Sequence, residues 1–230
     1  DEPVNARYYY RTNGLVNLDK SNMPSYQPEA YQKPGCPIIV DLNGDGLITV
    51  EDVDMKNVIP SLYWGFGNTF TYKNWDLDVF IYSQLGVDKY NDVYSWTSGR
   101  GLGNQTNNMS VYIKDVWHSE LNPNGTIPGI AYEMASVSLP GGAGTDIGYE
   151  NSSFVRVRNI TLGYNFKPNQ LGALSKLLSG IRVYVDVQNP FTFTGYTGLD
   201  PEVNTGGNYK GGKAEYPQTR TFSLGAKLSF

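Results

Sequence analysis

A run of oxygen-bearing side chains at alternate positions is the pattern in this sequence with the clearest chemistry. Asp41, Asn43 and Asp45 are followed by Gly46, and an acidic residue, Asp52, stands at the twelfth position of the same loop. A turn at the glycine gathers such oxygens around one centre, which is how calcium loops bind their ion. The sequence therefore predicts a Ca²⁺ site. Its predicted ligands are Asp41, Asn43, Asp45, the backbone carbonyl of Leu47, and Asp52.

Two features limit what this loop can be. Asp52 stands where a longer glutamate usually binds the ion through both oxygens, so Mg²⁺ is the alternative ion. Pro34 and Pro37 precede the loop, so we expect no entering helix and no EF-hand sensor. A turn rich in Asp and Asn that binds no metal is the simpler interpretation and stays open. If an ion binds, its expected role is to stiffen a long connection.

The sequence offers no convincing set of catalytic residues. Cys36 and His118 are the only cysteine and histidine, and nothing near either one predicts a catalytic pair. Asp76 and Asp78 alternate along one predicted strand, so we interpret them as part of a polar wall rather than as a general acid and base. A net charge of −4 without any basic run argues against nucleic acid as a partner. We therefore expect neither an enzyme nor a nucleic-acid-binding protein.

Aromatic side chains are abundant, with 18 Tyr, 4 Trp and 9 Phe. Rings in the long connections suit stacking on sugars or holding a peptide, and Tyr94, Trp96 and Tyr196 are the candidates for substrate binding. Packing within the connections is the alternative role for these rings, and we favour it. Rings near strand ends are expected to be girdle residues at a lipid interface. These are Trp64, Trp75, Tyr164 and Phe166.

The elements that must position all these residues are β-strands. Many aromatics together with 26 Gly and 13 Pro are typical of an all-β protein. Five segments alternate between apolar and polar residues, as two-faced strands do. They are Leu62–Tyr72, Trp75–Tyr82, Phe154–Phe166, Gly180–Gln188 and Thr221–Phe230. A sixth segment, Arg7–Val16, has a poorer pattern and is the weakest predicted strand.

The lengths of strands and connections indicate a membrane barrel. The segments have about 9–13 residues, close to what a tilted strand needs to cross a bilayer. Connections 73–74 and 167–179 are short or modest, whereas connections 19–61, 86–153 and 189–218 are long. Outer-membrane barrels alternate in this way because their periplasmic turns are short and their extracellular loops long. The C-terminus would then be periplasmic and the long loops extracellular.

Five short motifs follow one another along the chain. They are Asp41–Gly46, Ser153–Tyr164, Arg182–Asn189, Tyr196–Glu202, and Tyr216–Pro217 before a last strand that ends at Phe230. In this order they resemble the C-terminal part of SusC/RagA-type TonB-dependent transporters. The resemblance implies a barrel of about 22 strands with an N-terminal plug. Residues 1–230 would be its C-terminal segment, with about six antiparallel transmembrane strands and without the plug and the earlier strands.

The function that this resemblance implies is import across the bacterial outer membrane. The implied partners are the rest of the same barrel polypeptide, the lipid bilayer, a SusD-like surface lipoprotein, and the inner-membrane TonB complex acting through the missing N-terminal region. The implied cargo is an oligosaccharide or an oligopeptide. Phe230 resembles the last residue of the signal that outer-membrane assembly machinery reads. The alternative from another class is a secreted, calcium-stabilised β-sandwich that binds carbohydrate.

Overall fold

The chain divides into two compact units. The computed structural model describes residues 7–91, 94, 97, 109–129, 139–203 and 216–230. The sheet unit comprises residues 60–87, 151–203 and 215–230. The loop unit comprises residues 1–59, 88–150 and 204–214. Among the described residues, no helix combines the length and apolar content that a membrane span requires.

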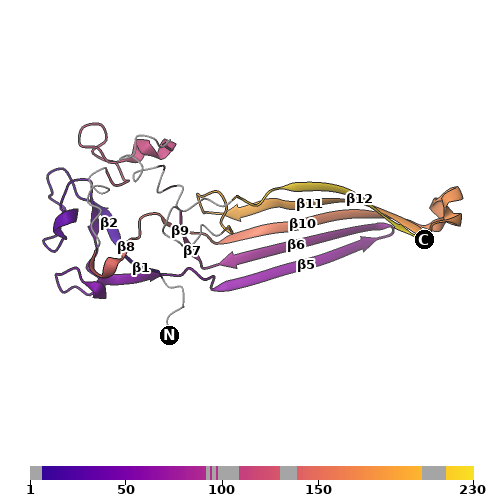
Figure 1. The fold of residues 1–230 in the computed structure, drawn as a ribbon, viewed down its shortest axis with the longest axis horizontal. Coiled ribbons are helices and arrows are strands. Elements are labelled where there is room, and N and C mark those ends of the chain that lie inside the picture. Colours follow the sequence, from indigo (N-terminus) through magenta and orange to yellow (C-terminus); the bar gives the residue numbers. More distant parts are fainter. Residues whose placement is uncertain (1–6, 92–93, 95–96, 98–108, 130–138, 204–215) are drawn as a thin grey trace. The chain divides into compact units, whose positions relative to one another are not determined.

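One five-stranded antiparallel sheet forms the sheet unit. Its strands are β5 (Leu62–Tyr72), β6 (Trp75–Leu85), β10 (Phe154–Phe166), β11 (Gly180–Thr194) and β12 (Thr221–Ser229). Their order in the sheet is β12-β11-β10-β6-β5, so each strand lies beside the next of the five in sequence (Figure 1). The five clear strands predicted from the sequence are confirmed, and β11 extends past its predicted end.

The register places apolar side chains on one face of this sheet. Phe70, Leu77, Leu162, Val185 and Leu224 stand opposite one another and make a row across all five strands. In water such a row is expected to be covered, because fully burying one side chain of this size is worth about 1.5–3 kcal/mol. Instead, Leu162 is 44% exposed and Leu224 is 77% exposed. Nothing in the described part of the sheet unit covers this face.

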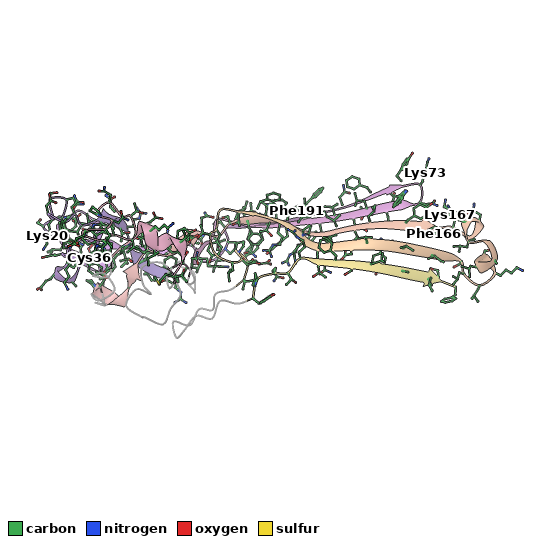
Figure 2. The ribbon with its side chains drawn as sticks, turned by 90° about the horizontal axis from the view of Figure 1, so that it is seen from above. Lys20, Cys36, Lys73, Phe166, Lys167 and Phe191 are labelled. Carbon is green, nitrogen blue, oxygen red and sulfur yellow. The ribbon has the colours of Figure 1, made fainter. Side chains whose placement is uncertain are left out.

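The connections at one end of the sheet are short. Lys73 and Asn74 alone join β5 to β6, and Lys73 has a left-handed backbone with φ of 56°. The connection from β10 to β11 holds two short 3-10 helices, η5 (Pro168–Gln170) and η6 (Gly172–Lys176). Figure 2 shows Lys73, Phe166 and Lys167 together at this end, with Phe191 farther along the sheet. The predicted short connections are confirmed.

A bulge changes the direction of side chains near the other end of β10. The register shifts between Val157 and Asn159 against both neighbouring strands. A bulge places one extra residue on a strand and redirects the side chains beside it. Here Arg156 and Arg158, on either side of Val157, both form ion pairs with Glu202. The bulge therefore brings two cations to one acidic group.

Short strands and a small core make up the loop unit. Its strands are β1 (Arg7–Tyr10), β2 (Thr12–Leu15), β3 (Pro37–Ile39), β4 (Val53–Lys56), β7 (Asp88–Tyr90), β8 (Gly144–Thr145) and β9 (Tyr149–Asn151). β1 lies between β4 and β8, β2 pairs with β3, and β7 pairs with β9. The buried core consists of Tyr10, Tyr31, Cys36, Ile39 and Leu139.

The prediction of a sixth long strand is wrong for residues 7–16. This segment forms β1 and β2, which belong to two different small sheets and do not join the long one. The physical reason is local. Tyr10 is fully buried in the core of the loop unit, and Gly14 has a positive φ of 74° that interrupts the pairing of β2 with β3. An uninterrupted pleat, which a membrane strand needs, is therefore absent from this segment.

Candidate functional site

Polar side chains line the sheet face opposite to the apolar row. Thr69, Asp78, Thr161, Asp186 and Ser223 stand opposite one another on the five strands. The Thr69 hydroxyl donates a hydrogen bond to Asp78, and the Thr161 hydroxyl donates one of 2.6 Å to Asp186. Carboxylates and hydroxyls suit a face that is in contact with water, as the interior of a membrane barrel is.

An ion pair crosses the middle strand of this polar face. Arg182 on β11 donates to Asp76 on β6, with Nε 3.2 Å from Oδ1, and Asn165 donates to the same oxygen at 2.5 Å. β10 runs between the two partners, and its Gly163 lies directly opposite Asp76. A Cβ at Gly163 would lie 2.5 Å from Asp76 Oδ2 and 2.7 Å from Arg182 Nε. The missing side chain therefore leaves the space that this ion pair occupies.

A buried cluster of charges lies beyond the bulge, and we call Arg156, Arg158, Asp200 and Glu202 the Arg156 cluster. The Arg156 side chain is 2% exposed. Its guanidinium donates to Asp200 at 2.8 Å, to Glu202 at 2.6 Å and to the Thr192 hydroxyl at 2.9 Å. Arg158 forms a second ion pair with Glu202. Each of the three guanidinium nitrogens of Arg156 therefore has an acceptor, as a buried cation requires.

Asp200 connects the two ends of the long connection between β11 and β12. Its Oδ1 accepts from Arg156 and from the backbone N–H of Glu202 at 2.8 Å, and its Oδ2 accepts from the N–H of Gln218 at 2.9 Å. Burial alone would raise the pKa of the Asp200 carboxyl, but these three donors outweigh it and lower this pKa below its usual value. Asp200 is therefore charged at neutral pH and holds the base of the connection.

The predicted metal loop forms a turn in which carboxylates accept hydrogen bonds from the loop's own backbone. Asp41 accepts from the N–H groups of Gly44 and Gly46 at 2.6 and 2.8 Å, and Asp45 accepts from the N–H of Leu47 at 2.8 Å. Within the described residues, no group of three or more His, Cys, Asp or Glu side chains is placed to hold a metal ion. The first half of the loop is thus shaped by hydrogen bonds of its own carboxylates.

Asp52, the last predicted ligand, is fully buried and serves the backbone. Its Oδ1 accepts from the N–H of Leu42 at 2.9 Å, and its Oδ2 accepts from the N–H of Thr49 at 2.7 Å, in a capping box that starts η2 (Val50–Asp52). Burial would raise the pKa of Asp52, but these N–H groups lower it overall. The predicted ion, with Asn43 and the Leu47 carbonyl among its ligands, stays a prediction.

The candidate substrate-binding rings have different surroundings. Tyr196 is 7% exposed, and its ring fills the space beside Gly198, where a Cβ would lie 2.4 Å from the ring. Tyr94 is half-buried and stacks edge-on against Tyr112 with centroids 5.3 Å apart. Trp96 lies outside the described residues. These surroundings favour packing as the role of Tyr196, whereas the Tyr94–Tyr112 pair keeps part of its surface in solvent.

The remaining candidate residues are Phe230, Cys36 and His118. Phe230 directly follows β12 and is 82% exposed, so its ring is available to a partner. Burial raises the pKa of the Cys36 thiol, which keeps the thiol protonated and unreactive. The Nδ1 atom of His118 accepts from the N–H groups of Glu120 and Leu121 at 3.2 and 3.1 Å. No hydrogen bond between Cys36 and His118 is present among the described residues.

Sequence reasoning missed the Arg156 cluster. Arg156 and Asp200 are separated by 44 residues, and alternation along a strand says nothing about which acid a buried arginine will meet. One signal was present, because two arginines flank Val157 in a strand that is otherwise regular. A charged pair within a predicted strand that has one lipid face indicates a buried partner on the other face.

Several known proteins resemble this chain in sequence. No family model matches the chain. The chain is 31% identical, over all of its length, to TonB-dependent receptor P3 of Formosa agariphila, of which it spans 22%. It is 33% identical over 208 residues to TonB-dependent receptor SusC of Bacteroides thetaiotaomicron, an alignment that covers 88% of this chain and 19% of SusC.

The fold agrees with the sequence relatives. The RagAB peptide importer in its closed-closed state superimposes on this structure with a TM-score of 0.66 at 22% sequence identity, over 97% of this chain and 23% of that one. The open-open state of RagAB gives a TM-score of 0.65. The five long strands of the sheet unit thus match the barrel of a TonB-dependent transporter. With the predicted motifs and the curated relatives in agreement, the chain belongs to the SusC/RagA type of TonB-dependent receptors.

Proposed function

We propose that this chain forms part of the wall and the outer loops of an outer-membrane importer that depends on TonB. The observation that carries the proposal is the two-faced sheet, which is apolar and uncovered on one side and polar on the other. Such a sheet suits hydrocarbon outside and water inside. The chain spans 22% and 19% of the lengths of its curated relatives, so the activity belongs to the larger assembly.

The strand lengths support a membrane crossing. β5 and β6 have 11 residues each. At about 3.4 Å per residue and a tilt of about 45°, such a strand rises about 26 Å. The apolar band of an outer-membrane barrel is about 25 Å tall. Strand length and membrane thickness therefore agree, without any adjustment of the sheet.

The edges of the sheet call for further strands of the same barrel. β5 and β12 each pair with only one strand among the described residues. In hydrocarbon, every unpaired backbone N–H or C=O costs several kcal/mol. We therefore infer that the rest of the barrel polypeptide pairs with both edges.

The orientation follows from the two kinds of connection. The short ones, Lys73–Asn74 and residues 167–179, are assigned to the periplasmic side together with Phe230. The long ones, which include the loop unit, are assigned to the extracellular side. The Arg156 cluster holds the base of one long connection, and would keep that loop fixed at the barrel mouth.

Partners and cargo are inferred from the family. The relatives are TonB-dependent receptors, which supports coupling to the inner-membrane TonB complex through a region outside this chain. A SusD-like surface lipoprotein is the inferred partner at the barrel mouth. The cargo is an oligosaccharide or an oligopeptide, and the name of RagAB as a peptide importer supports the second. We assign no enzymatic activity to the chain.

A secreted β-sandwich, the rival function, is not supported. A sandwich needs a second sheet that packs on the apolar face of the first. The described part of the sheet unit contains one sheet only, and Phe70 in the apolar row is 55% exposed. A sandwich with this face open to water would be prone to association.

Membrane fractionation of the full-length protein tests the proposal. We expect it in the outer-membrane fraction, extractable only with detergent, and we expect uptake of labelled oligosaccharide or oligopeptide to be lost when the energy-coupling complex is deleted. Recovery of the protein in the soluble fraction, or uptake that is independent of that complex, would refute the proposal.

A further inference from the structure

The short connections at one end of the sheet form a single rigid surface, which we call the turn platform (residues 72–75 and 164–179). Asn74 Nδ2 donates to Gln170 Oε1 at 2.8 Å, and the N–H of Asn165 donates to the Asn74 carbonyl at 2.8 Å. Gln170 also donates to the Tyr164 hydroxyl at 3.2 Å. These bonds join two turns that are about 90 residues apart in sequence. Figure 2 shows Lys73 and Lys167 at this same end.

Three lysines and no acidic side chain belong to this platform. Lys73, Lys167 and Lys176 are all exposed, and residues 72–75 and 164–179 contain no acidic side chain. Within the part of the chain that the structure describes, none of the three ammonium groups forms an ion pair. The nearest acid in sequence, Asp76, is already paired with Arg182 on the polar face. The platform therefore presents three cations that an external anion can reach.

Apolar groups accompany the lysines. Leu174 and Leu177 flank Lys176 and are 54% and 68% exposed. Trp75 and Tyr164 stack edge-on with centroids 4.8 Å apart, and Tyr164 and Phe166 do so at 4.7 Å. Amphipathic rings and lysines with apolar stems are the residues that occupy the boundary between hydrocarbon and headgroups. The composition fits a lipid interface better than it fits bulk water.

The backbone at Lys73 adds an independent observation. Its φ of 56° is a conformation that Gly or Asn adopts more readily than a residue with a long side chain. Its ammonium group lies over the Tyr72 ring, 5.2 Å from the ring centroid. A lysine thus occupies a turn position, at the tip of the hairpin, that favours a smaller residue.

We propose that the turn platform binds the headgroups of anionic phospholipids in the leaflet that it borders, through Lys73, Lys167 and Lys176. This inference rests on the proposed function, since it needs the strands to cross the membrane. The lysines supply the charge complementary to the lipid phosphates. Leu174, Leu177 and the stacked rings supply the apolar contact. The bound lipid fixes the depth of the barrel on its turn side.

Lipid analysis of the full-length transporter tests this binding. The protein is reconstituted in nanodiscs of equal parts phosphatidylcholine and phosphatidylglycerol, re-extracted, and its retained lipids are counted by mass spectrometry. We expect enrichment of phosphatidylglycerol, reduced on the order of fivefold by each of Lys73→Asn, Lys167→Gln and Lys176→Gln, and weakened by high salt. Asn suits the left-handed turn, so Lys73→Asn keeps the hairpin.

Lys227→Gln is the matched control. Lys227 is an exposed lysine of the same sheet, but it stands opposite Arg182 on the polar face, so its removal is expected to leave the enrichment unchanged. Equal enrichment in the wild type and in a variant that carries all three substitutions, with both extracted as folded barrels, overturns the lipid site alone. Failure of the wild type to enter nanodiscs as a barrel overturns the proposed function, and the lipid site with it.

Discussion

At the residue scale, the polar face depends on one missing side chain. Gly163 leaves the space through which Arg182 reaches Asp76, and no other residue type leaves that path open. The Arg156 cluster follows a related logic, because Arg156 is buried and every acceptor around it is needed. Removing one partner of a buried ion pair destabilises the protein by about 3–5 kcal/mol, since the other charge stays buried without a partner.

Replacement of Gly163 by Ala is expected to destabilise the barrel by about 1–3 kcal/mol, because the new methyl group overlaps both members of the ion pair. Thermal unfolding of the full-length transporter, followed by its loss of heat-modifiable gel mobility, measures this effect. Gly195→Ala is the control, since a Cβ there meets no atom within 4 Å. Equal unfolding midpoints for the two variants would show that the Arg182–Asp76 ion pair does not depend on the absence of a side chain at residue 163.

The stability of the folded barrel is expected to depend on pH through Asp200, and the lowered pKa of this carboxyl fixes the direction. Its folded-state pKa is lowered from about 3.9 in an unfolded chain, so its stabilising contribution is complete above about pH 4 and is lost as pH falls through the folded value. The midpoint difference between wild type and Asp200→Asn is therefore expected to be large at pH 7 and to shrink in acid. A difference that stays constant down to the lowest pH at which the barrel remains folded would contradict this assignment.

At the element scale, alternation along the chain predicted five strands because each has one face for lipid and one for water. β11 exceeded its predicted end because Asn189, with φ of 49°, and Pro190 break the alternation without ending the strand. The same pattern failed at residues 7–16, where tertiary packing of Tyr10 decides the structure. Tyr196, a candidate substrate-binding ring for which packing was the favoured role, is buried. Ring type alone does not reveal exposure.

The metal loop is tested by calorimetric titration of the intact protein with Ca²⁺. The prediction is saturable binding that disappears in Asp41→Ala/Asp45→Ala. Asp52→Ala is expected to lower stability by about 1–3 kcal/mol whether or not an ion binds, because it removes the acceptor of the Thr49 and Leu42 N–H groups. If the titration of the intact protein shows no binding, the segment is a turn rich in Asp and Asn that binds no metal.

Phe230 follows the last strand with an exposed ring, as a recognised end of a barrel would. Deletion of Phe230 is expected to lower the amount of assembled barrel in the outer membrane several-fold, with unassembled protein accumulating in the periplasm. Quantitative blotting of outer-membrane fractions measures it, with Phe230→Tyr as a conservative comparison. Unchanged levels after the deletion would remove the assembly role from this residue.

At the scale of the whole molecule, the assignment of these strands to a membrane barrel depends on which solvent each sheet face meets. The sequence predicted this division, since apolar and polar residues alternate in all five strands, but not the ion pairs of the polar face. Those pairs join residues 44 to 106 positions apart, and strand periodicity carries no information about such contacts. Among the described residues, β5 and β12 each pair with only one strand, which is why we infer further strands of the same barrel at both edges.

The most direct test is a spin-label scan along β12 of the full-length transporter in lipid bilayers, one cysteine at a time from residue 221 to residue 229. We predict a period of two, with oxygen collisions dominant at Phe222, Leu224 and Leu228, and collisions with a water-soluble nickel complex dominant at Ser223 and Lys227. Equal access of the nickel complex to both sets would show that no face of this strand lies in hydrocarbon, and the account would fail.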